Sequence, residues 1–158
     1  GAMEVQVLPP PPPPVATCDG RAVTVDLAMG QSPTSGNDVI RGTAGPDDVD
    51  GLGGHDRFCG LDGNDTFDGG PGADRAFGDR GADILRGQGG NDHRDGAAGN
   101  DRAFGQLGRD VARGASGRDL VEGGPGNDGL NGGPQRDTCR GLAGTDTGTG
   151  CEVRIGIP

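Results

Sequence analysis

From Pro33 to Thr149 the sequence divides into thirteen nonapeptides without insertion or deletion, and this period limits the folds open to the chain. Each unit follows the frame G-x-x-G-x-D-x-U-x, in which U is usually apolar; GLDGNDTFD over 60–68 is one example. Glycine fills the first position except at Pro33, and the fourth position except at Gln135. This spacing is not the strict Gly-X-Y triplet, which excludes a collagen helix. It predicts a solenoid of stacked turns.

The sixth position is aspartate in every one of the thirteen units. These residues are Asp38, Asp47, Asp56, Asp65, Asp74, Asp83, Asp92, Asp101, Asp110, Asp119, Asp128, Asp137 and Asp146. A solenoid with this sequence therefore carries one such carboxylate in every unit.

Within each unit, positions one to six are expected to form a glycine-rich turn with positive φ. Positions seven to nine are long enough for a three-residue strand whose middle side chain points inward. The prolines of the repeats agree with this division, because all of them fall in turn positions where no ladder amide is needed. They are Pro33, Pro46, Pro71, Pro125 and Pro134.

The eighth position is therefore expected to line the interior, and it supplies only a thin core. Its residues are Ile40, Val49, Phe58, Phe67, Ala76, Leu85, Arg94, Ala103, Ala112, Val121, Leu130, Cys139 and Gly148. One inward side chain in nine cannot offset an ordering cost of about 1–2 kcal/mol per residue, so a metal or a similar staple is required. Arg94 is costly at an inward position unless it is paired or turns toward solvent.

Composition indicates which partners suit such a chain. The 36 Gly and 12 Pro would indicate disorder if no period were present. The net charge of −10 comes from 21 Asp and three Glu against 14 Arg, which disfavours nucleic acid and anionic membranes and favours cations. No run of 18 apolar residues is present, so no membrane-spanning segment is expected.

The repeats closely resemble the GGxGxDxUx calcium-binding nonapeptides of RTX (hemolysin-type) proteins. The chain looks like a secreted, actinobacterial-like member of that family. The likeness covers the thirteen units, about three quarters of the chain. The resemblance implies an all-β fold, a right-handed parallel β-roll with two nonapeptides per turn and about 6.5 turns, capped at both ends. It also implies Ca²⁺ ions held between successive turns on each side, which suits a hard cation that prefers oxygen ligands.

By the same resemblance, each ion takes the sixth-position carboxylate and main-chain carbonyls of the second and fourth positions. The fourth-position carbonyls are those of Gly36, Gly45, Gly54, Gly63, Gly72, Gly81, Gly90, Gly99, Gly108, Gly117 and Gly126. The second-position carbonyls are those of Thr34, Thr43, Leu52, Leu61, Gly70, Asp79, Gln88, Ala97, Gln106, Ala115 and Gly124. Six gaps on one side and five on the other set a ceiling of eleven ions.

Eleven divalent ions would change the net charge from −10 to about +12, so some sites are expected to be weak or empty. Arginines beside the ligand aspartate at Arg109, Arg118 and Arg136, and Gln135 in place of a turn glycine, make the C-terminal sites least secure. The alternative is a calcium-free solenoid in which the aspartates only form turn hydrogen bonds.

The segments flanking the repeats divide the chain further. Residues 1–17 are expected to be a tag remnant and a polyproline linker, 18–32 an N-terminal cap with the strand Ala22–Leu27, 33–149 the roll, and 150–158 a C-terminal cap.

Four cysteines suggest two disulfides and an oxidising location, with free cytosolic thiols as the alternative. Stacking at about 4.8 Å per turn separates Cys59 from Cys139 by roughly 20 Å, beyond the ~7 Å that a disulfide spans. Pairing Cys18 with Cys139 would require Cys59 to span much the same length to Cys151. The remaining pairs are Cys18 with Cys59 and Cys139 with Cys151, one securing each end.

These features predict a calcium-binding extracellular structural module, secreted or at the bacterial surface, whose folding is coupled to calcium. It is expected to be a monomer that does not bind nucleic acid. No nucleophile, base and orienting group occur together in the sequence, so no enzyme activity is expected. The alternative is a surface adhesion or ligand-binding module that presents the roll to a glycan, a protein or ice.

Overall fold

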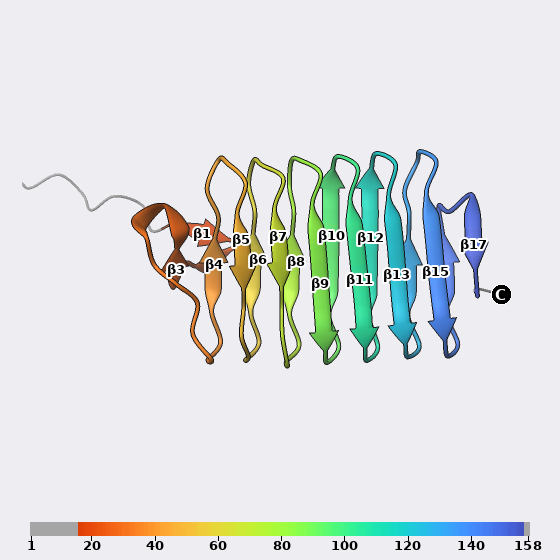
Figure 1. Ribbon diagram of the computed structural model, residues 1–158, viewed down its shortest axis with the longest axis horizontal. Helices are drawn as coiled ribbons and strands as arrows, with labels where there is room; N and C mark the ends of the chain where they lie inside the picture. The colour runs from red at the N-terminus through yellow and green to blue at the C-terminus, as the bar shows by residue number, and fades with distance from the viewer. Residues whose placement is uncertain (1–15, 157–158) are drawn as a thin grey trace, which may run out of the picture.

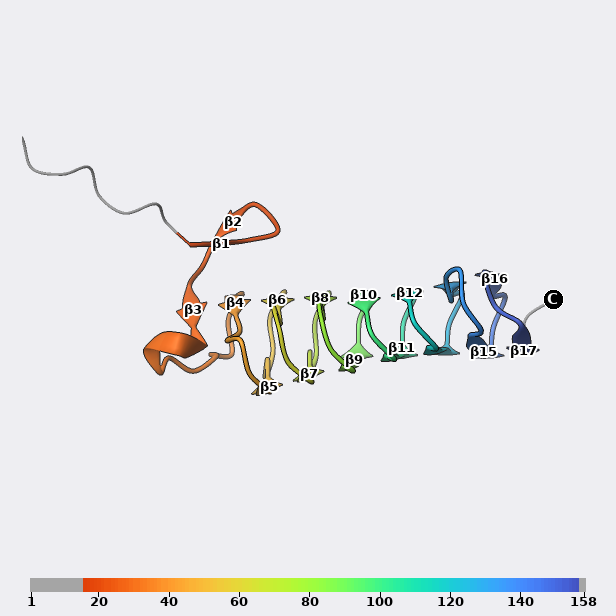
Figure 2. The same cartoon turned by 90° about the horizontal axis from the view of Figure 1, so that it is seen from above.

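The computed structural model describes residues 16–156, and it has the expected parallel β-roll with two nonapeptides per turn. Figure 1 shows the strands in a row along the long axis, and Figure 2 shows two sheets facing each other across a narrow interior. The chain alternates between the sheets, so neighbouring strands in one sheet are 18 residues apart through the repeats. The expected tag remnant Gly1–Met3 and the polyproline stretch Pro9–Pro14 lie outside the described residues.

The first sheet holds eight strands and the second holds seven. In chain order the first contains β3 (Val25–Asp26), β4 (Val39–Arg41), β6 (Arg57–Cys59), β8 (Arg75–Phe77), β10 (His93–Ala98), β12 (Val111–Ser116), β14 (Gly129–Asn131) and β16 (Thr147–Thr149). The second contains β5 (Asp48–Asp50), β7 (Thr66–Asp68), β9 (Ile84–Gly89), β11 (Arg102–Leu107), β13 (Leu120–Pro125), β15 (Thr138–Ala143) and β17 (Val153–Ile155).

Six of these strands have six residues, so the expectation of three-residue strands is wrong for β9–β13 and β15. The extra residues are positions one to three, because the third-position N–H donates to the second-position carbonyl one turn earlier. Ala98 N–H donates to Asp79 O at 2.8 Å in this way. Pro125 is therefore the last residue of a strand rather than part of a turn, and it has no N–H to donate toward β11.

The inward eighth-position side chains form two separate apolar clusters. The N-terminal cluster runs from Val25 to Leu85 and includes Phe58 and Phe67, whose rings stack with centroids 4.9 Å apart. The C-terminal cluster contains Ala103, Ala112, Val121, Leu130 and Cys139. Gly148, the last residue of the series, is only partly buried. The core is thus as thin as the sequence predicts, and it is interrupted between Leu85 and Ala103.

Side chains at the fifth position connect successive turns on the outside of the roll. Where this residue is asparagine, its Oδ1 accepts the fifth-position N–H one turn later, as from Ala82 to Asn64 at 2.8 Å. His55 plays the same part through Nδ1, which accepts from Ala73 N–H at 2.8 Å. This side-chain ladder satisfies a backbone donor that the turn itself leaves free.

A short hairpin of β1 (Thr17–Cys18) and β2 (Arg21–Ala22) lies beside the first sheet (Figure 2). Cys18 is joined to Cys59, and the Asp19 carboxylate contacts Arg57 and lies 3.8 Å from Arg75. The expected strand Ala22–Leu27 is divided among β2, β3 and a 3₁₀ turn over Leu27–Met29. β3 pairs in parallel with β4 at the end of the first sheet.

At the other end of the roll, β17 pairs with β15 and Cys139 is joined to Cys151. Both disulfides have Cα atoms 5.8 Å apart, so the pairing expected from the repeat geometry is confirmed.

Eight second-position residues other than glycine have left-handed backbone, with φ from 69° to 79°. They are Leu52, Leu61, Asp79, Gln88, Ala97, Gln106, Ala115 and Leu142. This conformation costs a residue with a Cβ about 1–2 kcal/mol, so the chain carries strain at these eight positions, whereas Thr34 and Thr43 replace the same glycine without a positive φ.

Ala97→Gly is expected to raise the free energy of unfolding by about 1 kcal/mol, because glycine removes the left-handed strain at φ 70° and returns only part of the gain as unfolded-chain entropy. Ala98→Gly is the matched control, since Ala98 lies in the same strand without a positive φ and should lose about 0.5–1 kcal/mol. Denaturant unfolding in calcium measures both. Destabilisation by Ala97→Gly would contradict the strain argument.

Candidate metal centre

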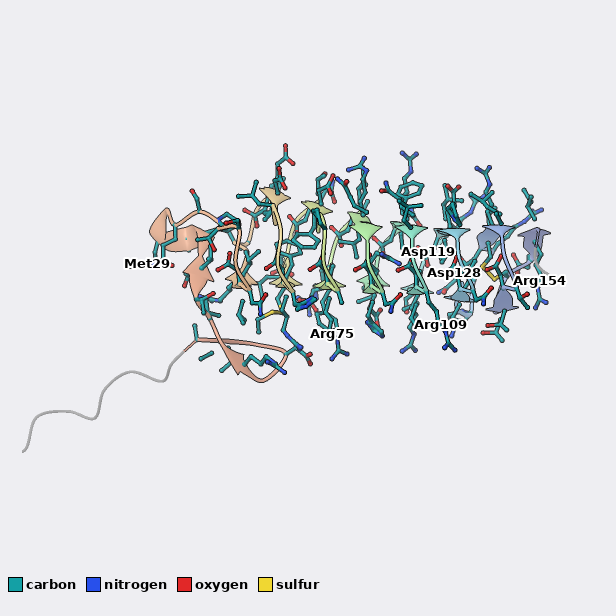
Figure 3. All side chains as sticks on the ribbon, turned by 90° about the horizontal axis from the view of Figure 1, so that it is seen from below. Met29, Arg75, Arg109, Asp119, Asp128 and Arg154 are labelled. Atoms are coloured by element: carbon teal, nitrogen blue, oxygen red, sulfur yellow. A yellow bond between two sulfur atoms is a disulfide. The ribbon has the colours of Figure 1, made fainter. Side chains whose placement is uncertain are left out.

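The sixth-position aspartates are brought together in two files, one on each side of the roll. Twelve of the thirteen are buried, and Asp47 is half-buried. In Figure 3, Asp119 and Asp128 lie between the sheets, whereas Arg75 and Arg109 lie on the outside. The repeat therefore places an acidic side chain in the interior at every half turn.

The carboxylates from Asp56 onward are each oriented by a hydrogen bond from the preceding turn. The main-chain N–H of the sixth-position residue donates to Oδ1 of the aspartate 18 residues later, as from Asp65 to Asp83 at 2.8 Å. Eleven such bonds run from Asp38 to Asp146, all at 2.8 or 2.9 Å. Sequence reasoning missed this ladder, although the identity of all thirteen aspartates at a fixed 18-residue stacking distance was a signal for it.

The second carboxylate oxygen has no comparable partner. Oδ2 is buried without a hydrogen bond in ten aspartates, namely Asp56, Asp65, Asp74, Asp83, Asp101, Asp110, Asp119, Asp128, Asp137 and Asp146. A buried carboxylate oxygen without a donor is costly, so each of these atoms requires a proton, a donor or a cation. The calcium-free alternative accounts for Oδ1 through its hydrogen bond but leaves Oδ2 unsatisfied.

A main-chain oxygen approaches the same space as each of several Oδ2 atoms. A methyl carbon built on first-position Gly51 would lie 2.8 Å from both Asp56 Oδ2 and the carbonyl oxygen of Gly69. At Gly60 the corresponding carbon would collide with Asp65 Oδ2 and lie 2.7 Å from Gly78 O. We call this space a cradle. It is bounded by a first-position glycine, by Oδ2 of the aspartate in the same unit, and by the first-position carbonyl oxygen one turn later. It explains why the first position is glycine.

The fourth-position carbonyls also point from one turn to the next. A methyl carbon on Gly81 would collide with the carbonyl oxygen of Gly63, and the same holds along both files. The second-position carbonyls of Leu61 and Asp79 instead accept ladder hydrogen bonds at 2.9 and 2.8 Å. The first-position carbonyls, which the sequence analysis did not include, border the same space as the Oδ2 atoms.

Three aspartates differ, because donors from the chain reach their Oδ2 atoms. Asp38 Oδ2 accepts from Thr34 N and Oγ1 at 2.7 and 3.0 Å, and Asp47 Oδ2 accepts from Thr43 N at 2.7 Å. Asp92 Oδ2 lies 3.4 Å from Nη1 of Arg94. The main-chain hydrogen bonds between turns also change at Gln135. Most other fourth-position N–H groups donate to a main-chain carbonyl one turn later, as Gly99 does to Ser116, whereas Gly117 N–H donates to the Gln135 side chain.

Burial dominates the electrostatics of the aspartate files. It raises the pKa of Asp56, Asp65 and Asp74 to about 6, although the backbone hydrogen bond from the previous turn opposes the shift. The same cause, with a backbone hydrogen bond opposing it and neighbouring carboxylates adding to it, raises the pKa of Asp101 to about 7. Near neutral pH these sites therefore favour the uptake of positive charge.

The donor set suits a hard cation that accepts main-chain oxygens. Within residues 16–156, no group of three or more His, Cys, Asp or Glu side chains that could hold a metal occurs. The oxygens that border each cradle are one carboxylate oxygen and main-chain carbonyls, which are donors that calcium accepts. Oxygen donors without nitrogen or sulfur favour calcium over zinc. The fold and its files of partnerless carboxylate oxygens define a class of cation-binding β-solenoid.

Comparison with protein families gives the same assignment. The model for the RTX calcium-binding nonapeptide repeat (4 copies) matches residues 33–67, 68–103, 95–130, 104–139 and 113–148. The chain belongs to this family, and it is a calcium-binding structural repeat module. A search of curated proteins found no match to the chain. The part of the chain that the structure describes has no helix long and apolar enough to cross a membrane.

Without calcium, the folded roll is expected to be more stable at pH 5 than at pH 7.5. Asp56, Asp65, Asp74 and Asp101 have pKa values of about 6 to 7 in the fold, above the unfolded value of 3.8, so the folded state binds more protons in this window. The stabilisation is complete below the unfolded pKa and is lost as the pH rises through the folded pKa values.

Thermal unfolding followed by circular dichroism in chelator measures this effect. In saturating calcium the trend should reverse, because protons compete with the cation for the same oxygens. A chelated protein with a higher melting temperature at pH 7.5 than at pH 5 would contradict the burial argument.

Proposed function

We propose that this chain is an extracellular module whose folding is coupled to calcium binding at the sixth-position aspartates. The observation that carries the proposal is the set of ten buried Oδ2 atoms without a partner. The chain's own donors satisfy Oδ1 but not Oδ2, so the metal-free roll contains a file of uncompensated negative charge.

The residues proposed to bind calcium are the sixth-position aspartates through Oδ2, together with carbonyl oxygens of neighbouring turns. First- and fourth-position carbonyls face the adjoining turn in the geometry above, and they support this ligand assignment. Bound calcium supplies positive charge and oxygen coordination between turns. The glycines hold the carbonyls close to the carboxylates because no Cβ intervenes.

Coupling to folding follows from the balance of forces. The interior contains few apolar side chains, and the carboxylates repel one another along each file. Burial raises the pKa of Asp65, Asp74 and Asp101, and the negative charge of neighbouring aspartates raises it further. Removing the cation leaves this repulsion in place with little hydrophobic compensation. Calcium is therefore expected to stabilise the folded state by mass action.

An extracellular location is part of the same proposal. Extracellular calcium is abundant, and an oxidising environment preserves the two disulfides at the ends of the roll. A module of this kind would remain unstructured between its disulfides at low calcium and become rigid outside the cell. Its role there is structural rather than catalytic.

In chelator at pH 7.5 the oxidised protein is expected to lose most of its strand signal and its cooperative unfolding transition, because the carboxylates then have no counter-charge. Millimolar calcium should restore both, whereas the same concentration of magnesium should restore less, since it requires stricter octahedral geometry. Circular dichroism and calorimetry measure the response. An identical strand content and melting temperature with chelator and with calcium would refute the coupling.

Asp101→Asn is expected to have opposite effects in the two conditions. Asparagine retains the Oδ1 acceptor for Asp83 N–H but removes a carboxylate whose pKa is raised to about 7, so in chelator the variant should retain more strand signal than wild type. In calcium it should be less stable by about 1–3 kcal/mol, because a ligand is lost.

Asp62→Asn is the matched control, since it removes the same charge from an exposed third-position residue paired with Arg80 at 3.5 Å. It should shift stability by less than about 0.5 kcal/mol in either condition. If the two variants behave alike in calcium, Asp101 is not a ligand.

A further inference from the structure

Arg94 interrupts the core of the roll. It is the eighth-position residue of β10, and its side chain is 1% exposed. Its neighbours in the same inward column of the sheet are Ala76 and Ala112. The N-terminal apolar cluster ends at Leu85 and the C-terminal cluster begins at Ala103, so Arg94 lies between them.

The guanidinium lies between two sixth-position carboxylates on the same side of the roll. Nη1 is 3.4 Å from Asp92 Oδ2, and Nη2 is 3.5 Å from Asp110 Oδ1. Both carboxylates are buried, and they belong to successive turns, in the units 87–95 and 105–113. A buried arginine between two aspartates compensates their negative charges, which would otherwise repel each other.

The position of the guanidinium coincides with a cradle. A methyl carbon built on Gly87 would collide with Arg94 Nη1 and with Asp92 Oδ2. The same construction on Gly69 meets Asp74 Oδ2 and, at 3.0 Å, the carbonyl oxygen of Gly87. Arg94 thus places a positively charged nitrogen in the space that other turns leave to oxygens alone. Accordingly, Asp92 Oδ2 is not among the buried oxygens without a partner.

We propose that the Arg94 guanidinium occupies the cradle between units 87–95 and 105–113 in place of a calcium ion. This inference rests on the proposed function, because it presumes that the remaining cradles bind calcium. Arg94 contributes one positive charge and fixed donors that do not depend on metal concentration. The middle of the folded roll therefore contains one turn-to-turn contact of opposite charges that requires no metal.

The first test is diffraction from wild-type crystals grown in calcium, with anomalous data to locate the ions. Calcium is expected on the same side of the roll in the gaps on either side of Arg94, between Asp74 and Asp92 and between Asp110 and Asp128. No ion is expected between Asp92 and Asp110. A calcium ion in that gap, with Arg94 displaced, would overturn the inference.

The second test counts ions in variants by native mass spectrometry of the oxidised protein. Arg94→Ala matches Ala76 and Ala112, the neighbours of Arg94 in its column, and should bind one more calcium than wild type because the cradle becomes free. Arg113→Ala removes the same charge from an exposed residue 3.8 Å from Asp95 and should leave the count unchanged.

The outcomes separate the two proposals. If wild type binds calcium and Arg94→Ala binds the same number, the assignment of Arg94 is wrong while the proposed function stands. If wild type binds no calcium, both are wrong. If Arg94→Ala does not fold in calcium, the wild-type anomalous map decides the question alone.

Discussion

The structure depends on the hydrogen bond between a sixth-position main-chain N–H and Oδ1 of the aspartate one turn later. The bond repeats eleven times and fixes the carboxylates from Asp56 to Asp146 in one orientation, which leaves Oδ2 of ten of them buried without a partner. The same residue therefore joins successive turns and introduces the charge that opposes their close approach. A cation is the simplest compensation, because a proton neutralises one carboxylate but does not link turns.

The two halves of the roll are stabilised differently. The N-terminal half has the stacked pair Phe58 and Phe67 and the hairpin joined through Cys18. Its first two aspartates already receive donors from Thr34 and Thr43. The C-terminal cluster consists mainly of smaller side chains, and six aspartates in this half have a buried Oδ2 without a partner, against four in the N-terminal half. If folding is coupled to calcium as proposed, the C-terminal half depends more on the metal than the N-terminal half does.

Most of the fold could be predicted from the nine-residue period of the sequence. It predicted a solenoid, the inward eighth position and, once the family resemblance had supplied the parallel roll with two units per turn, the disulfide pairs. It did not predict the six-residue strands, because local propensity does not show that the third-position N–H finds an acceptor 18 residues earlier. Nor did it assign the cradle of Arg94, since the sequence indicated only that an inward arginine needs a partner. Of its two partners, Asp92 is close in sequence, whereas Asp110 belongs to the next turn and is brought near only by the fold.

The interval of 18 residues between partners affects how such a roll changes length. At the level of the main chain every nonapeptide is equivalent, so adding or losing one unit would still leave each turn with a neighbour of the same form. Side chains impose a stricter rule. Asn64 accepts a hydrogen bond from Ala82, and Arg94 lies between Asp92 and Asp110, because the units that contain these partners are two apart and so lie on the same face. Duplication in pairs preserves these specific contacts, whereas a single-unit change exchanges the faces of everything that follows.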